Sequence, residues 1–215
     1  MKMRFPLSRG RALGFLVLTA ALAALGATTT PAQAALGLAC PAATSKVFAP
    51  WNDFANYAYA PNGGFESGSS GWSLAGGAKV VAGNSTFFTH GAGERYSLSL
   101  PKGSSATSPP MCISLFSSKM RFFAANAGSP SSKLKVQVIY GGGVGGLLSL
   151  ATKTLGLSDF GAITAGPAWQ PSSSIGMLSG TLPLLTKSVQ FRFVPADADG
   201  AWLVDDVYLD PLMHG

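Results

Sequence analysis

Reactive side chains are scarce in this chain of 215 residues, which has two cysteines and two histidines. Charged residues make up only 11% of it. The histidines, His90 and His214, are far apart in the sequence, and no Gly-x-Ser-x-Gly motif marks a hydrolase nucleophile. A Ser-His-Asp arrangement built on His90 stays open, because triads are recognised in space and not in sequence. We therefore expect no enzyme activity.

Long apolar runs are also lacking, since the longest extends from Ala12 to Leu25, about 14 residues. That is short of the roughly 20 residues that cross a hydrocarbon core, so a retained membrane helix is not expected. Basic residues precede the run, and Ala32-Gln33-Ala34 follows it as a small-x-small cleavage site. This order is typical of a secretory signal peptide over residues 1–34 and predicts a secreted, extracellular protein.

A strong charge of one sign is absent once this leader is set aside. The leader carries four of the fifteen basic residues, which leaves eleven Lys and Arg against nine acids in the rest of the chain. Nucleic-acid partners normally require a clustered basic face, so none is expected. The alanine-rich leader favours a bacterial host.

The exported chain of about 180 residues has the size of one domain with a substantial core. Cys40 and Cys112 would meet an oxidising compartment, and a disulfide between them is the first expectation. It would attach an N-terminal arm, residues 35–60, to a domain over residues 61–215. A reactive or metal-binding pair is the alternative, but no His or further Cys lies near either residue in the sequence.

Short alternating runs dominate residues 61–215. Each has one apolar face and ends in Gly, Pro or Ser, which predicts strands of antiparallel sheets that cover a shared core. These runs are 96–100, 120–124, 134–140 and 189–193. Residues 147–160 fit a strand and loop or a short helix, and we favour strand and loop. Residues 36–60 show no period and predict an extended arm packed on the domain.

The two ends of this domain carry its most informative motifs. Asn62-Gly63-Gly64-Phe65-Glu66 leads to Gly71-Trp72, and Trp202 to Pro211 closes the domain with Asp205-Asp206 at its centre. Together they resemble the first and last strands of galactose-binding-like jelly-roll modules, such as carbohydrate-binding-module families 4, 9 and 22. The resemblance implies an all-β, antiparallel jelly-roll β-sandwich in which the two ends lie side by side.

The same resemblance implies a structural calcium site. In those modules the Glu of the opening strand and an Asp of the closing strand bind calcium, and Glu66, Asp205 and Asp206 match these positions. Calcium prefers six to eight hard oxygen ligands, which carboxylates supply. Alternation along a strand points Asp205 and Asp206 to opposite faces, so we expect only one of them at the metal. The alternative is that all three are turn or surface residues satisfied by backbone amides.

Aromatic residues of the arm are the candidate ligand-binding residues. Trp51, Tyr57 and Tyr59 are less committed to a core than Trp72, Trp169 and Trp202, as are Phe87 and Phe88 in a Gly-rich loop. Aromatic rings bind the apolar face of sugars, although such rings more often belong to a core. We therefore expect a secreted, non-enzymatic binding module for glycan or cell-envelope polysaccharide. The alternative is a structural or adhesive cell-surface protein of the same fold without a sugar site.

Overall fold

The structure is a computed structural model, and it describes residues 44–112, 119–141, 148–155, 168–176, 188–196 and 200–210. All of them lie in one compact unit, Pro31–Gly215. The predicted leader, Cys40 and the side chain of Cys112 lie outside what is described, so the predicted signal peptide and disulfide stay predictions. Among the described residues, no helix is long and apolar enough to cross a membrane.

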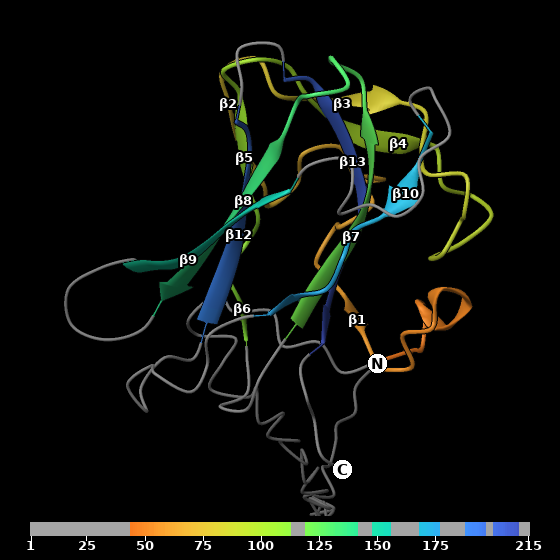
Figure 1. Cartoon of the computed structure of the whole chain (residues 1–215). Coiled ribbons are helices and arrows are strands. Elements are labelled where there is room, and N and C mark those ends of the chain that lie inside the picture. The colour runs from red at the N-terminus through yellow and green to blue at the C-terminus, as the bar shows by residue number, and fades with distance from the viewer. Residues whose placement is uncertain are drawn as a thin grey trace, which may run out of the picture. The chain divides into compact units, whose positions relative to one another are not determined.

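Two antiparallel sheets make up the domain (Figure 1). The first, the seven-stranded sheet, has the order β10-β7-β13-β4-β3, with β1 also paired to β13 and β11 to β7. Its strands are β1 (Ala58–Tyr59), β3 (Lys79–Ala82), β4 (Tyr96–Leu100), β7 (Lys119–Asn126), β10 (Gln170–Pro171), β11 (Ile175–Gly176) and β13 (Trp202–Asp210).

The second, the six-stranded sheet, has the order β2-β5-β12-β8-β9, with β6 paired to β12. Its strands are β2 (Ser73–Ala75), β5 (Ser105–Thr107), β6 (Met111–Cys112), β8 (Leu134–Gly141), β9 (Leu148–Leu155) and β12 (Ser188–Pro195). The described residues contain no α-helix, and only the 3-10 turn η2 (Ala49–Trp51) departs from strand and loop. The expected all-β jelly-roll sandwich is confirmed.

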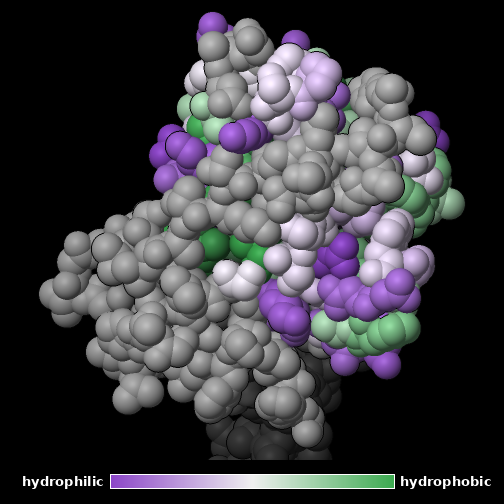
Figure 2. All heavy atoms as spheres, in the orientation of Figure 1, coloured by the Kyte–Doolittle hydropathy of each residue, from purple (hydrophilic) through white to green (hydrophobic). Residues whose placement is uncertain are grey.

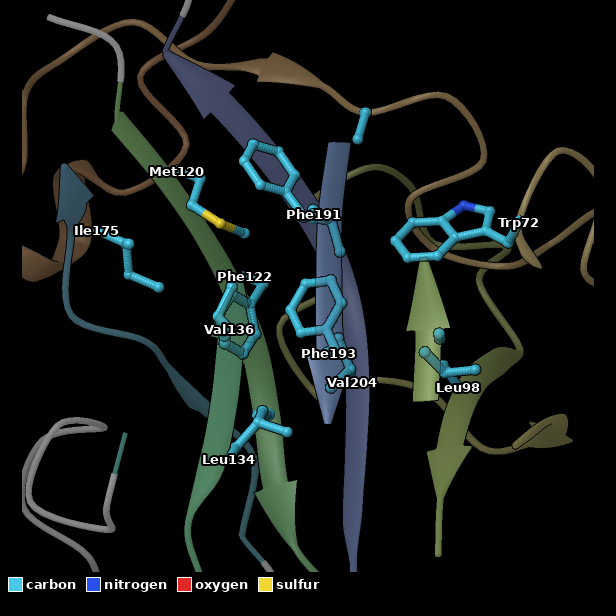
Figure 3. Close-up of a cluster of buried hydrophobic side chains, with 14 of the residues drawn as sticks. Trp72, Leu98, Met120, Phe122, Leu134, Val136, Ile175, Phe191, Phe193 and Val204 are labelled. Atoms are coloured by element: carbon cyan, nitrogen blue, oxygen red, sulfur yellow. The ribbon is translucent and has the colours of Figure 1, made fainter. Parts of the chain in front are cut away.

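The main core lies between the inner faces of the two sheets. Figure 3 shows Phe191 and Phe193 of β12 facing Met120 and Phe122 of β7. The rings of Phe122 and Phe193 meet edge to face at 5.0 Å. Because alternate residues of a strand point to opposite faces, the predicted runs also supply Leu98 and Leu100 of β4 and Leu134, Val136 and Val138 of β8 to this core. Burial of these side chains is the main driving force for holding the sheets together.

Four predicted runs are strands β4, β7, β8 and β12, and β9 occupies part of the segment 147–160. The opening motif is not a strand, which corrects the prediction: residues 61–71 form a series of turns. Its place in space is as predicted. Phe65 and Val207 both lie in the main core, and the backbone N–H of Val207 donates to the oxygen of Gly63 at 3.2 Å.

The arm packs against the outer face of the seven-stranded sheet, the face opposite the main core. Phe48 and Tyr57 of the arm bury their rings against Phe123 of β7 and Tyr208 of β13. Ser45 and Tyr57 form an isolated bridge, and β1 pairs with the end of β13. The outer face of this sheet is thus a second, smaller aromatic core.

Candidate functional site

The centre of β13 contains a β-bulge that determines where its acidic pair points. Two residues, Asp206 and Val207, stand opposite one residue of β7, because the register shifts between Asp205 and Tyr208. Asp206 has a φ of 48°, in the left-handed region. The inward positions are Trp202 and Val204 before the bulge, and Val207 and Leu209 after it. The extra residue therefore changes which positions face inward.

The bulge corrects the expectation that only one Asp faces the site. Without it, Asp206 would follow Val204 into the core; with it, both carboxylates lie on the outer face. A single residue, Ser85, binds both: its N–H donates to Asp205 Oδ2 at 2.6 Å and its hydroxyl donates to Asp206 Oδ2 at 3.0 Å. Both acids are buried, with at most 1% of either exposed.

The loop over this acidic pair consists of residues 83–94, and we call it the 83–94 loop. Besides Ser85, it contributes Thr89, whose hydroxyl donates to Asp206 Oδ2 at 2.8 Å and accepts from the Tyr208 hydroxyl at 3.2 Å. Glu94 ends the loop, and its Oε1 accepts from the His90 N–H at 3.0 Å. We call Glu94, Asp205 and Asp206, with their hydroxyl partners, the carboxylate pocket.

Two buried oxygens of this pocket, Asp206 Oδ1 and Glu94 Oε2, accept from no other group, and a hydrogen bond between these two side chains contributes to the pKa of each. An ionised carboxylate can only accept, so the two groups cannot satisfy each other unless one holds a proton. Leaving a buried charged acceptor unsatisfied costs at least 1–3 kcal/mol, roughly. The pocket therefore favours binding either a proton or a cation.

The pKa values follow from the same arrangement. Burial, and then the charge of Asp206, raise the pKa of Glu94 to about 7. The same two causes raise the pKa of Asp205 to about 9. Burial also raises the pKa of Asp206, against the opposing effect of hydrogen bonds from Thr89 and Ser85. Each shift means that the native pocket holds protons more tightly than isolated carboxyl groups do.

The donor chemistry of the pocket fits a hard cation such as calcium. A Cβ atom built on Gly64 would lie 3.3 Å from Asp206 Oδ1 and 3.5 Å from Asp205 Oδ1, and would clash with the Tyr59 hydroxyl. Oxygens of three side chains thus converge beside the turn at residues 61–66. In the described part of the chain, no group of three or more His, Cys, Asp or Glu side chains could by itself hold a metal ion. A calcium shell would therefore need hydroxyl, main-chain or water oxygens as well.

Glu66, the third predicted metal ligand, lies at the rim of this pocket. Its side chain is exposed, and its Oε1 accepts from the N–H groups of Arg95 and Tyr96 at 2.7 and 2.9 Å. Its charge contributes to the raised pKa of Glu94, which places it near the pocket. The structure thus brings Asp205 and Asp206 together inside the pocket and leaves Glu66 beside it.

The predicted aromatic residues are not equivalent. Tyr57 is 1% exposed and donates to Asp53 at 2.8 Å, so its ring belongs to the second core and offers no open face. Trp51 is half-buried, and its ring meets Phe87 edge to face at 4.9 Å and Phe123 at 5.4 Å. We call Trp51 and Phe87, the latter 37% exposed, the aromatic platform.

Tyr59 belongs to the carboxylate pocket and not to the platform. Its ring stacks on His90 with centroids 3.7 Å apart and planes 6° from parallel. Burial, followed by the charges of Asp206 and Asp205, raises its pKa far above the ordinary range. Its hydroxyl is consequently a neutral donor beside the acidic pair.

Sequence reasoning missed Glu94, Ser85 and Thr89, because no motif connects a Gly-rich loop to a strand more than a hundred residues away. The bulge did have a signal. Apolar residues occupy even positions at Trp202 and Val204 and odd positions at Val207 and Leu209, and a change of phase within one strand indicates an inserted residue.

No family model and no curated protein matches this chain. Among solved structures, it is similar to the CBM22-1 xylan-binding domain from Paenibacillus barcinonensis Xyn10C, with a TM-score of 0.45 and 16% identity over 71% of this chain and 93% of that one. It is also similar to TmCBM61 in complex with β-1,4-galactotriose, with a TM-score of 0.43 and 15% identity over 70% and 96%.

A further similar structure is the enzymatically active domain of tailspike protein 4 from bacteriophage CBA120, with a TM-score of 0.48 and 13% identity over 70% of this chain and 21% of that one. The carbohydrate-binding modules among these structures agree with the resemblance found in the sequence. A similarity of this degree concerns the fold alone.

Proposed function

We propose that this chain is a secreted, non-enzymatic binding module that holds carbohydrate on the aromatic platform. The observation that carries the proposal is the way in which neighbouring aromatic rings hold the side chain of Trp51 in place. Its ring is half-buried and packs against Phe48, Phe87 and Phe123 at 6.2, 4.9 and 5.4 Å. A fixed aromatic ring with a partly open surface suits the apolar face of a sugar and loses little side-chain entropy on binding.

The residues around the platform suit the hydroxyl groups of a sugar ring. Figure 2 shows hydrophobic side chains bordered by hydrophilic ones where Figure 1 draws the arm in orange. Asn52 is exposed, follows Trp51 directly in the sequence and can bind hydroxyl groups. Ser85, whose hydroxyl donates to Asp206 in the pocket, is fully buried and is therefore not an accessible nucleophile.

Calcium is the cation that we propose for the carboxylate pocket, with Asp205 and Asp206 as its carboxylate ligands, Glu66 at its rim, and hydroxyl, main-chain or water oxygens to complete its shell. When bound, it would supply the positive charge that Asp206 Oδ1 and Glu94 Oε2 lack. Hydrogen bonds within the pocket, from Ser85 and Thr89 to Asp205 and Asp206, connect the 83–94 loop to β13.

Retention on immobilised polysaccharides tests the binding function. We expect the whole chain to be retained by at least one glycan in a panel of plant and cell-envelope polysaccharides, and Trp51→Ala to reduce retention at least tenfold. Tyr96→Ala is the matched control, because Tyr96 is 41% exposed on β4 and outside the platform. Absence of retention on every glycan would reject the proposal.

An adhesive surface protein without a sugar site is the second candidate. Phe54 and Phe88 are 65% and 47% exposed, and large exposed apolar side chains occur at protein-binding surfaces. This candidate predicts that Phe54→Ser abolishes attachment to a protein-coated surface, whereas Trp51→Ala leaves it unchanged.

A further inference from the structure

Two ring pairs join the arm to the 83–94 loop. One is the aromatic platform, in which Phe87 meets Trp51 edge to face. The other lies three residues further along the loop, where the ring of His90 stacks on Tyr59 with centroids 3.7 Å apart and planes 6° from parallel. We call this second pair the His90–Tyr59 stack. The proposed function uses only the first pair.

The His90 ring offers a flat face to solvent. Tyr59 is half-buried and covers one face of the imidazole, whereas His90 as a whole is exposed. The exposed part of the ring is therefore the face turned away from Tyr59, together with the edge that carries its nitrogens. Such a ring can stack on the apolar face of a sugar, and its nitrogens can bind the hydroxyl groups.

Both ring pairs stand on the outer face of the seven-stranded sheet. Phe123 of β7 supports the platform, with its ring 5.4 Å from Trp51 and 5.0 Å from Phe87. Tyr208 of β13 supports the stack, with its ring 5.1 Å from Tyr59. Because the two supporting rings belong to neighbouring strands of one sheet, the exposed sides of both pairs point away from the same surface.

The register of β7 and β13 gives the spacing of the two supports. Tyr208 is paired with Arg121, two residues before Phe123 on β7, so Tyr208 and Phe123 are diagonal neighbours. Diagonal neighbours lie about 7–8 Å apart. The ring of Phe48 fills the space between them, 5.4 Å from Phe123 and 5.6 Å from Tyr208. A continuous layer of buried rings thus holds the platform and the stack at a separation longer than one sugar ring and within the length of a short glycan chain.

We infer that the His90–Tyr59 stack is a second sugar subsite, so that the module binds a linear glycan chain along its length, with one sugar ring on Trp51 and another on His90. This inference rests on the proposed function. Once one sugar of a chain is bound, the next binds at a high effective concentration, and affinity rises without any new surface. A single sugar can occupy only one of the two subsites.

Oligosaccharides of increasing length are the probes for the test. Calorimetric titrations of the whole chain use xylo-, cello-, manno- and β-1,4-galacto-oligosaccharides, each from the monosaccharide to the hexasaccharide. We expect the affinity for at least one series to rise at least tenfold with length and then to level off once a chain reaches both subsites. Binding of none of these series, or an affinity that does not change with length, would overturn the inference.

Two variants of His90 separate sugar stacking from loop packing. His90→Ala should remove the rise of affinity with length and leave the affinity for the monosaccharide, which Trp51 binds, unchanged. His90→Phe keeps a flat ring on Tyr59 and should restore most of the rise. Tyr96→Ala is the control, since this exposed ring of β4 lies outside both pairs, and should keep the full rise. Equal losses in His90→Ala and His90→Phe would assign the effect to the packing of the loop and overturn the inference.

The outcomes distinguish this inference from the proposed function. An unchanged length dependence in His90→Ala, together with lost retention in Trp51→Ala, would overturn the second subsite and support the platform. Retention that Trp51→Ala leaves unchanged and His90→Ala removes would support the stack as a sugar site and reject the platform.

Discussion

Two acidic sites on the outer face of the seven-stranded sheet differ in where their positive charge comes from. Asp53 of the arm lies 3.0 Å from the Arg121 guanidinium and also accepts from the Tyr57 hydroxyl and the Ala55 N–H. Burial alone would raise the pKa of Asp53, but these hydrogen bonds and the charge of Arg121 hold it below its ordinary value. This site carries its own cation.

The carboxylate pocket has the opposite electrostatics. The charges that act on Asp205 belong to other carboxylates, Asp206 and Glu94, and its pKa rises to about 9 after burial is included. Hydroxyl and amide donors from the 83–94 loop satisfy only part of its oxygens. A buried carboxylate on this face stays ionised when an Arg lies within reach, as at Asp53. Where no Arg does, as in the carboxylate pocket, its charge must be neutralised by a proton or a cation from solution.

Arg121→Met should give the largest effect. The guanidinium pairs with Asp53, donates to the oxygen of Ser172 at 2.9 Å and lies 4.2 Å from the Phe48 ring centre. Its loss leaves a carboxylate on a largely covered face without its partner, which costs about 3 kcal/mol. Thermal unfolding should show a melting temperature lower by about 10 °C.

Lys119→Met on the same strand is the control for Arg121→Met. Lys119 is exposed, so the substitution should change the unfolding free energy by less than about 0.5 kcal/mol. Equal losses in the two variants would mean that the arm site owes its stability to strand packing and not to the ion pair.

The same substitution should have opposite effects on stability at Asp53 and at Asp206. In chelator, Asp206→Asn should raise the unfolding free energy by about 1–2 kcal/mol, because it removes a buried charge and supplies a donor toward Glu94. Asn also tolerates the left-handed φ at this position. Asp53→Asn should lower the unfolding free energy by a similar amount or more. Calcium should stabilise Asp53→Asn as it stabilises the unsubstituted protein, but not Asp206→Asn; losses of the same sign would contradict the contrast.

The sequence predicted the sandwich because its strands obey a simple alternation. Phe191 and Phe193 face the core while Gln190 and Arg192 do not, and no other element competes for those residues. The opening motif is predicted as a strand only through its resemblance to the first strand of jelly-roll modules. In the structure Phe65 has a φ of 62° within the turns, a conformation that a local pattern cannot specify.

The pocket was only half predictable. Asp205 and Asp206 were identified through a resemblance, but their common orientation depends on the bulge, and Glu94 reaches them only through the course of the 83–94 loop. Tyr57 and Trp51 stand six residues apart in the arm and look alike in the sequence. Only the hydrogen bond to Asp53 and the packing on Phe48 assign Tyr57 to the second core.

Gly63→Ala tests whether the placement of the bulge, and not only its acids, makes the pocket. A Cβ at residue 63 would lie 2.8 Å from the backbone oxygen of Val207, a group that cannot move without shifting β13. We expect a loss of about 2 kcal/mol and a weaker response to calcium. Gly93→Ala, where a Cβ meets nothing within 4 Å, should leave both unchanged. A normal calcium response in Gly63→Ala would separate the pocket from the bulge.

The pH dependence of stability comes from the same carboxylates. In chelator, the pKa of Glu94 rises from an ordinary 4.5 to about 7, and that of Asp205 from 3.8 to about 9. The native state then binds more protons than the unfolded state between these values, so the unfolding free energy falls as pH rises.

The pocket's contribution to the unfolding free energy is complete below about pH 4 and is lost progressively up to about pH 9. The contribution of Asp53 is present above about pH 4 and is lost in stronger acid. We therefore expect the melting temperature in chelator to fall from pH 5 to pH 8, and saturating calcium to reduce that slope. Asp206→Asn should flatten it without calcium, because one of the interacting charges is gone; a slope unchanged by both treatments would place the titrating groups outside the pocket.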